Sequence, residues 1–424
     1  MRARFFLLLL IFVGCKDNER DDEGRHLPFD ASKPIEVTSF MPDSGRIREK
    51  IVIKGSNFGN DKSKVKVIFK DALTERISTV IGVDNNTIYC LAPRQISGQN
   101  TISIEIDGKT VIPTRVFAYS ASENVSTIAG GAGGTKTDGS LAEANFSYMH
   151  GIAALGDEKI LVFQRDNPAV RYISVPDNTV ITVHAGFQAG KPTVTTDRNT
   201  VYATGWDSPH TVYRYTRESG WAPSRLGALG TFARIRSLAL DQTEKWLYFC
   251  DRDGKFGRFE IATQEVEILN PALDIVKSGD GGYLIFDPFH DCFYMSVQAA
   301  YGIYKIAKNA QGIYEAAPYA GFNGNRVTNG YLSESAFAQP NGMTLDEDGN
   351  IFIAEGSGAY LIRKISAIDG YVSTIAGRTN VEGNTDGSPL DARFSYPYDI
   401  SNDGQGNYYI AEAWGVRVRK YAIE

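Results

Sequence analysis

The sequence has few cysteines and histidines, no cluster of basic residues and no long helical pattern. Its 424 residues include four cysteines and five histidines, and 44 lysines and arginines against 50 acidic residues give a net charge of −6. Nucleic-acid binding needs a basic stripe, so this charge distribution argues against nucleic acid as a partner. The 42 glycines, 22 tyrosines and 22 phenylalanines instead predict many short strands joined by tight turns.

One long apolar run is present, and it lies at the N-terminus. A basic start, with Arg2 and Arg4, precedes the apolar residues 5–13, a run too short to span a bilayer, which takes about 20 residues. This layout is typical of a secretory signal. The segment that ends it, Phe12-Val13-Gly14-Cys15, resembles the bacterial lipobox, although Phe12 replaces the usual Leu. The resemblance implies a signal peptide at 1–14 and lipidation of Cys15. The alternative is an ordinary cleaved signal with an accidental cysteine.

Residues 15–33 form a short polar segment. The residues after Cys15, KDNERDDEG, include no apolar side chain, so the segment cannot bury itself and is expected to be a flexible acidic tether. Acidic residues at this place resemble the signal that exports lipoproteins of the Bacteroides group to the outer face of the outer membrane. The resemblance implies a lipid-anchored protein that faces the cell exterior. A generic linker would explain the composition equally well.

Residues 34–121 alternate short apolar runs with Gly, Asn, Asp and Pro, which predicts a small sandwich of short strands. Three segments, IEVTSFMPDSG at 35–45, IKGSNFG at 53–59 and LAP at 91–93, resemble an immunoglobulin-like domain of the IPT/TIG family. Gly55 and Gly59 are expected at positions where the backbone torsions are hostile to a side chain. The resemblance implies a spacer domain, which we prefer here to direct ligand contact.

The remaining residues, 122–424, contain an internal repeat that decides the fold. TIAG at 127–130, followed by DG at 138–139 and ANF at 144–146, returns as TIAG at 374–377, DG at 386–387 and ARF at 392–394. A looser copy spans 319–337. The pattern is similar to the NHL family of propeller repeats. A second pattern, two apolar strands around a polar loop with Arg or Lys in the later strand, recurs in six units of roughly 40 to 55 residues, which predicts six four-stranded blades.

The two ends of this repeat region complement each other. The sixth unit stops after its third strand, whereas VSTIAG at 125–130 matches the fourth-strand sequence at 372–377. We expect residues 125–130 to complete the last blade and close the ring, which removes an exposed sheet edge. The predicted fold class is all-β, an IPT/TIG sandwich followed by a six-bladed NHL-type β-propeller.

The loops between the second and third strands of the blades are the expected binding site. In a propeller these loops share a face with the blade-to-blade connections, so the six loops surround one channel mouth. They mix aromatic rings with charged groups, a combination that suits a sugar and would also suit a peptide. The candidate ligand-binding residues are Arg165, Trp206, Asp207, His210, Arg252, Tyr301, Glu355, Tyr360, Glu412 and Trp414.

Cysteine and histidine offer little for a metal or cofactor. With Cys15 lipidated, three cysteines allow at most one disulfide, and Cys250 and Cys292 are expected to be buried thiols. No Cys/His spacing suggests a metal site. Only His150 and His210 are expected near the channel, too few for a three-histidine site, although carboxylates could complete one. No metal, cofactor or catalytic residue is therefore assigned.

The blade-to-blade loops contain an Asp-Gly pair in two of their copies. Asp138 and Asp386 occupy the Asp position. We interpret each as a turn residue whose side chain caps its own backbone, in preference to a calcium ligand.

Together these features favour a non-catalytic cell-surface lipoprotein that binds an extracellular polysaccharide beside an outer-membrane importer in a glycan-uptake system. The glycan part rests on analogy with lipoproteins of similar layout as well as on the residues. One alternative is a protein–protein interaction scaffold. Another is a polysaccharide lyase or hydrolase, since NHL-like propellers host such enzymes and Glu355 and Glu412 could form an acid–base pair.

Overall fold

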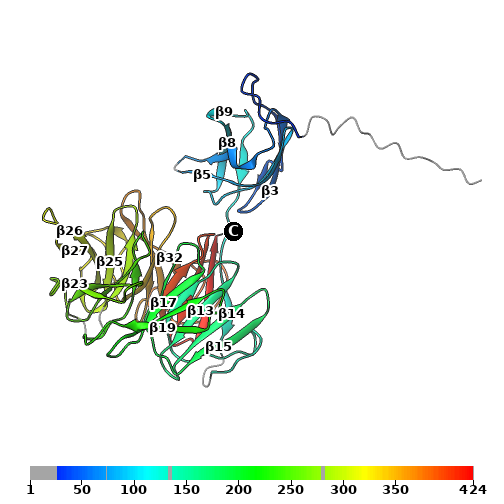
Figure 1. The fold of residues 1–424 in the computed structure, drawn as a ribbon. Coiled ribbons are helices and arrows are strands. Elements are labelled where there is room, and N and C mark those ends of the chain that lie inside the picture. Colours follow the sequence, from blue (N-terminus) through cyan, green and yellow to red (C-terminus); the bar gives the residue numbers. More distant parts are fainter. Residues whose placement is uncertain (1–25, 73, 132–135, 278–281, 424) are drawn as a thin grey trace, which may run out of the picture. The chain divides into compact units, whose positions relative to one another are not determined.

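The structure, a computed structural model, describes residues 26–72, 74–131, 136–277 and 282–423. The chain divides into two compact units, one that ends at Ala121 and one that runs from Ser122 to Ile423 (Figure 1). The predicted signal peptide 1–14, the lipidation site Cys15 and the tether up to residue 25 lie outside the described residues. Within the described part, no helix has the length and apolar character needed to cross a membrane.

The first unit consists of two β-sheets around one apolar core. One sheet has the order β1 (Glu36–Met41), β3 (Lys50–Ser56), β7 (Thr87–Leu91), β6 (Thr79–Asp84). The other has the order β2 (Ser44–Gly45), β10 (Phe117–Tyr119), β8 (Gly98–Ile106), β4 (Val65–Lys70), β5 (Glu75–Ile77), with β9 (Lys109–Val111) paired to β8. Alternate residues, such as Ile102 and Ile104, are fully buried in the core, as expected where successive side chains point to opposite faces of a strand.

The two glycines singled out in this unit are required for different reasons. Gly59 has a φ of +77°, a torsion that suits glycine, as predicted. Gly55 does not have a left-handed φ, so the torsional explanation is wrong for it. A Cβ at Gly55 would instead lie 1.9 Å from the carbonyl oxygen of Glu36, so the close approach of β1 excludes a side chain.

The second unit is built from six sheets, each with a four-stranded antiparallel core. In chain order, the first five blades are β12 (Met149–Ala154), β13 (Lys159–Gln164), β14 (Ala169–Ser174), β15 (Thr179–Ala185); β16 (Thr193–Val194), β17 (Thr200–Thr204), β18 (Thr211–Thr216), β19 (Pro223–Ala228); β20 (Ala239–Leu240), β21 (Trp246–Cys250), β22 (Phe256–Glu260), β23 (Val266–Asn270); β24 (Tyr283–Asp287), β25 (Cys292–Val297), β26 (Gly302–Lys308), β27 (Tyr314–Gly321); and β29 (Pro340–Leu345), β30 (Ile351–Glu355), β31 (Leu361–Ile365), β32 (Tyr371–Gly377). A short strand, β28 (Gly330–Tyr331), extends the fifth sheet beyond β32.

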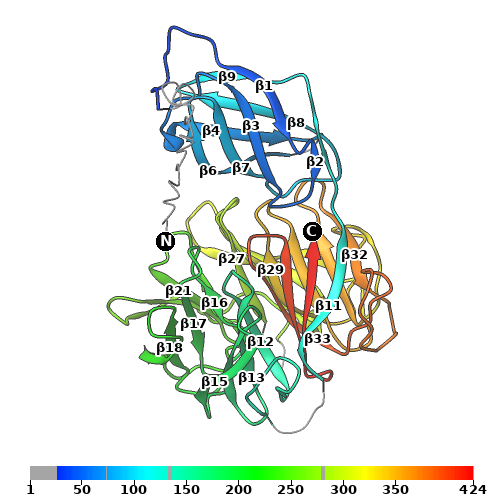
Figure 2. The ribbon, with the colours of Figure 1, turned by 90° about the vertical axis from the view of Figure 1, so that its right-hand side faces the viewer.

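The sixth blade combines the two ends of this unit. Its strands are β33 (Pro397–Asn402), β34 (Asn407–Glu412), β35 (Arg417–Ile423) and, from the beginning of the unit, β11 (Glu123–Gly130). β11 pairs antiparallel with β35, with Val125 opposite Tyr421, and Figure 2 shows the cyan strand beside the red C-terminal one. The sheet that ends the chain therefore has its fourth strand.

Hydrogen bonds also join neighbouring blades on or near their first strands, which are the innermost ones. Every pair of neighbouring blades has such a contact. They are Arg198 Nη1 to Ala154 O at 3.0 Å, Lys191 N to Arg236 O at 2.7 Å, Leu284 N to Ser237 Oγ at 2.7 Å, Ser296 Oγ to Asn341 O at 2.5 Å, Asn341 Nδ2 to Pro397 O at 3.0 Å and Ile152 N to Asp399 Oδ2 at 2.9 Å. The six blades therefore form a ring around a central channel.

The apolar core of the propeller lies between neighbouring blades, where buried side chains of adjacent sheets pack against each other. Cys250 and Cys292 are both buried and free in this core, so the prediction of buried thiols is confirmed. Cys90, in the first unit, is also a buried free thiol.

Candidate functional site

A cavity of about 300 Å³ lies on the face of the propeller where the loops between second and third strands meet the blade-to-blade connections. Arg165, Trp206 and Asp207, three of the predicted residues, line it. The other lining residues are Tyr148, Gln188, Arg234, Arg236, Gln298, Gln339, Tyr396 and Tyr398. The cavity is therefore lined by aromatic rings, guanidinium groups and side-chain amides.

Much of the wall comes from one equivalent position in five blades. At this position the backbone carbonyl accepts a hydrogen bond from the loop between the second and third strands of the same blade, at 2.7 to 3.1 Å. The residues are Tyr148, Gln188, Arg234, Gln339 and Tyr396. They were missed because the sequence argument considered only the loops between second and third strands. Three of them, Tyr148, Gln339 and Tyr396, lie two residues after the repeat's Phe, and this spacing was the signal that could have found them.

Trp206 and Tyr398, which line the cavity, belong to an aromatic stack that we call its floor. The His150 ring packs between those of Trp206 and Tyr398, with centroids at 4.1 and 4.6 Å. Arg236, which also lines the cavity, packs against this stack. Its guanidinium group is 5.3 Å from the centroid of the Trp206 ring and donates a hydrogen bond of 2.7 Å to the hydroxyl of Tyr283. The rings hold one another in place by offset and edge contacts.

The His150 side chain, in the middle of the stack, has a shifted pKa. Burial lowers its pKa well below the usual value, and the charges on Arg236, Arg165 and Arg234 lower it further. Only 1% of His150 is exposed, and neither ring nitrogen has a hydrogen-bond partner among the described residues. The expectation that His150 lies near the channel, made from the sequence, agrees with this position.

Below the stack, a buried ion pair occupies the channel. Lys191 Nζ lies 2.7 Å from Asp399 Oδ1, and both side chains are almost fully buried. Beyond the pair, a second cavity of about 690 Å³ opens between the first strands and the hairpin turns of the opposite face, and Lys191 is among its lining residues. The first cavity is therefore closed at its inner end.

Three of the predicted ligand-binding residues instead shape turns. His210, Tyr301 and Tyr360 have φ values of 53°, 53° and 59° and directly precede the third strand of their blades. His210 is 1% exposed, and its ring nitrogens lie 3.0 and 3.2 Å from the carbonyl oxygens of Gly205 and Phe232. It therefore holds its own loop against the next blade, and the prediction that it contacts ligand is corrected. Tyr301 and Tyr360 are half-buried and do not line the cavity.

Two further predicted residues lie outside the cavity wall. Arg252 is half-exposed, and its guanidinium group lies 3.9 Å from Asp253. Trp414 is 49% exposed and packs on the Tyr396 ring at 4.6 Å. Because Tyr396 lines the cavity, Trp414 can extend its aromatic surface outward.

Glu355 and Glu412 are not at the channel mouth, which corrects their assignment to the binding site. Both are fully buried, and they pair with the fully buried Arg363 and Arg419 at 3.0 and 3.1 Å. Burial raises the pKa of Glu355, and it raises that of Glu412 to about 7, although the arginines oppose the shift. In the first blade Gln164 takes the same place beside Arg171. These groups belong to structural arginine clusters and not to an acid–base pair.

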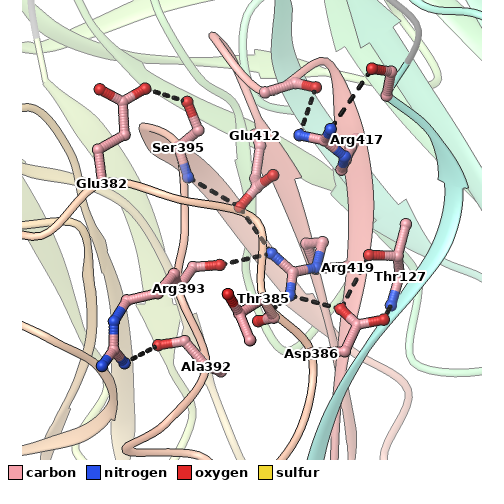
Figure 3. Close-up of polar contacts among 12 residues, drawn as sticks. Thr127, Glu382, Thr385, Asp386, Ala392, Arg393, Ser395, Glu412, Arg417 and Arg419 are labelled. Atoms are coloured by element: carbon pink, nitrogen blue, oxygen red, sulfur yellow. Dashed lines mark hydrogen bonds and ion pairs between the residues drawn. The ribbon is translucent and has the colours of Figure 1, made fainter.

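Figure 3 shows the cluster in the sixth blade. Arg419 donates to the backbone carbonyls of Arg393 and Thr385 at 2.8 and 3.0 Å, and its Nη2 lies 2.7 Å from Asp386 Oδ1. The same carboxylate accepts hydrogen bonds from the backbone and side chain of Thr127 in β11. Asp386 therefore ties the incoming loop to β35 and β11.

The interpretation of Asp138 and Asp386 as residues that cap their own backbone is wrong. Asp138 binds Arg171 and Thr182, as Asp386 binds Arg419 and Thr127. The reason is that the arginine in the third strand is buried and needs acceptors, which a short-range turn would not supply. The repeat's Phe completes each cluster, since the arginine lies 5.0 to 5.3 Å from its ring centroid in all three copies.

These clusters connect the repeat to the cavity. Each holds the segment that carries the repeat's Phe, and the residue two positions later, Tyr148, Gln339 or Tyr396, lines the cavity. Within the described ranges, no group of three or more His, Cys, Asp or Glu side chains is placed to hold a metal ion.

Comparisons with known proteins agree with this fold. Residues 34–122 match the family model of the IPT/TIG domain. A protein of unknown function from Bacteroides thetaiotaomicron, known from its crystal structure, is 51% identical, with a TM-score of 0.87 over 94% of this chain and 100% of that one. A search of curated proteins found no match. The predicted fold class, an IPT/TIG sandwich followed by a six-bladed NHL-type propeller, is confirmed.

More distant structures share the fold. An auxiliary nutrient binding protein from Bacteroides ovatus is 21% identical, with a TM-score of 0.63 over 94% of this chain and 100% of that one. A protein from Bacteroides thetaiotaomicron named as a candidate phosphatase is 17% identical, with a TM-score of 0.59 over 94% and 98% of the two chains. At these identities the likeness shows a common architecture alone.

Proposed function

The chain belongs to the same family as the Bacteroides thetaiotaomicron protein of unknown function, and on that premise we propose that it is a non-catalytic lipoprotein that binds an extracellular saccharide in the propeller cavity. It serves a nutrient-uptake system at the outer membrane, beside an importer that takes up the saccharide. The IPT/TIG domain acts as the spacer between the lipid anchor and the propeller.

The chemistry of the cavity is the observation that carries this proposal. Arg165 and Asp207 line the cavity and can pair with the hydroxyl groups of a sugar. The half-exposed ring of Trp414, which packs on Tyr396, offers a face on which the C–H groups of the sugar can stack. Amides of three glutamines add further donors and acceptors. The shared architecture with an auxiliary nutrient binding protein is consistent with this role.

The test is calorimetric titration with starch, xylan, β-mannan, homogalacturonan and chondroitin sulfate. We expect one of these polysaccharides to bind and the double variant Trp206→Ala, Trp414→Ala to weaken that binding at least about 10-fold, because buried Trp side chains are among the strongest contributors to binding. Trp206 supplies part of the cavity wall, and Trp414 supports Tyr396 from outside.

Trp246→Ala is the matched control. Trp246 begins β21 at the end of the strand remote from the cavity and packs under Arg258 at 3.8 Å, so its loss should leave the affinity unchanged. Binding that survives the double change intact would reject the cavity as the site. Release of reducing or ultraviolet-absorbing sugar products during the titration would point to a hydrolase or lyase instead.

Membrane attachment is tested separately at Cys15. The variant Cys15→Ser should move the protein from the membrane fraction to the soluble fraction of the cell, because acyl chains contribute roughly 0.8 kcal/mol for each buried CH2 group. Fractionation with immunodetection measures this, and digestion of intact cells with added protease reports whether the anchored protein faces the exterior. An unchanged membrane fraction in the variant would rule out lipidation at Cys15.

A further inference from the structure

We infer that the cavity takes the end of a saccharide chain, a terminal sugar or a short oligosaccharide, and does not grip a polysaccharide along its length. The inference rests on the proposed function, because it specifies which part of a saccharide occupies the site. Three features support it: the closed inner end of the cavity, its small volume, and buried polar atoms at its floor that lack a partner.

The inner end is closed by a side chain that lies across the channel. Asp399, from the sixth blade, accepts a hydrogen bond from the backbone of Ile152 in the first blade and one from Lys191 in the second. In the fifth blade, a Cβ on Gly342 would lie only 2.0 Å from Asp399 Oδ1. Contacts with three other blades place this carboxylate on the channel axis, between the two cavities. A polymer therefore cannot thread through the propeller.

The size of the cavity limits what can enter. Its volume of about 300 Å³ lies at the lower end of the range for small-molecule sites, roughly 300–1,000 Å³. A cavity of this size, bounded by rings on several blades, has room for the first units of a chain. The rest of a long polymer would lie outside it and contribute little contact.

The floor contains polar atoms that need a partner from the ligand. Trp206 Nε1 and both ring nitrogens of His150 are buried and have no hydrogen-bond partner among the described residues. Leaving such atoms unpaired is costly, and because Trp206 lines the cavity, a polar ligand group there can pair with Trp206 Nε1. A terminal sugar carries a free hydroxyl at the very tip of the chain, while an internal sugar has glycosidic bonds at both ends. The floor therefore matches a chain end.

The test is a calorimetric titration of the full-length protein with a series of di-, tetra- and hexasaccharides. The probes are maltooligosaccharides, xylooligosaccharides, mannooligosaccharides, oligogalacturonides and chondroitin oligosaccharides, together with their parent polymers. We expect affinity within the binding series to change less than about threefold between the di- and hexasaccharide. We also expect the parent polymer to bind in proportion to its number of chain ends.

Two variants test the floor directly. Trp206→Phe keeps an aromatic ring and removes the indole N–H, so the disaccharide should bind about 3- to 10-fold more weakly, the loss of one hydrogen bond. His150→Phe removes both ring nitrogens within the same stack and should also weaken binding. Trp246→Phe, the same change remote from the cavity, should have no effect.

Affinity that rises steadily up to the hexasaccharide, or several protein molecules bound along one polymer chain, would overturn end recognition while leaving saccharide binding intact. End recognition is also overturned if both floor variants fold and bind the disaccharide like the unmodified protein. Failure of every saccharide to bind would reject the proposed function itself, and end recognition with it.

Discussion

Replacing Lys191 by Met should lower the free energy of unfolding of the propeller by about 3–5 kcal/mol, the cost of breaking a buried ion pair by removing one partner. Lys191 Nζ lies 2.7 Å from Asp399 Oδ1 and 3.1 Å from the carbonyl oxygen of Ile400. The Asp399 side chain is fully buried, so in the variant its carboxylate would remain in the channel without a cation. The loss should exceed that of an ordinary core substitution.

Urea unfolding followed by tryptophan fluorescence measures this effect. All four tryptophans, Trp206, Trp221, Trp246 and Trp414, belong to the propeller, so the signal reports this unit without contribution from the first one. The double variant Lys191→Met, Asp399→Asn should recover part of the loss, because removing both charges avoids an uncompensated one. A single variant within about 1 kcal/mol of the parent would contradict the importance of the pair.

The pH dependence of the same variant has a defined sign. Burial raises the pKa of Asp399 above 3.8, and Lys191 acts to lower it. Without Lys191 the folded-state pKa must rise further. The folded variant then holds a proton that the unfolded chain has released, and its stability falls as the pH rises from about 4 toward the folded pKa. The stability deficit of Lys191→Met should therefore be smaller near pH 5 than near pH 8.

The sequence was sufficient to predict the fold because a propeller repeats its signals. Six copies of one strand pattern predict six blades, and the spacing from Gly139 to Phe146 and from Gly387 to Phe394 marks equivalent loops. The physical reason for that spacing was not visible. The spacing places each Phe beside a buried arginine some 25 residues later in the chain, such as Arg171 or Arg419. Only the folded blade brings this arginine close to the Phe ring.

The candidate site was predicted only in part. Arg165, Trp206 and Asp207 line the cavity, because the loops between second and third strands converge as expected. Glu355 was misplaced since its partner was overlooked: in the hairpin, Ile353 lies opposite Arg363, so Glu355 and Arg363 are diagonal neighbours on one face of the sheet, within reach of each other. Tyr148 was missed because it lies outside the loops between second and third strands, and Tyr398 because a short strand pattern does not show which strand of a blade is innermost.

The structural arginine clusters make a second large effect testable, and the chain itself supplies the comparison. Arg419→Met should lower the free energy of unfolding by about 3–5 kcal/mol. It would leave Glu412 buried without its cation, and it would remove the guanidinium group that donates hydrogen bonds to the carbonyls of Arg393 and Thr385. Urea unfolding with tryptophan fluorescence again measures the loss.

Glu412→Gln should instead change the stability by no more than about 1 kcal/mol, the size of one hydrogen bond. The first blade already uses this arrangement: Gln164 accepts from Arg171 at 3.1 Å and donates to Ser147 Oγ at 2.5 Å. In the sixth blade Ser395 occupies the place of Ser147, so the new amide has the same partner within reach. If Glu412→Gln were as damaging as Arg419→Met, the carboxylate charge would be essential to the cluster. If it is tolerated, the cluster depends on the arginine and its acceptors, and the sixth blade holds the Tyr396 segment as the first blade holds the Tyr148 segment.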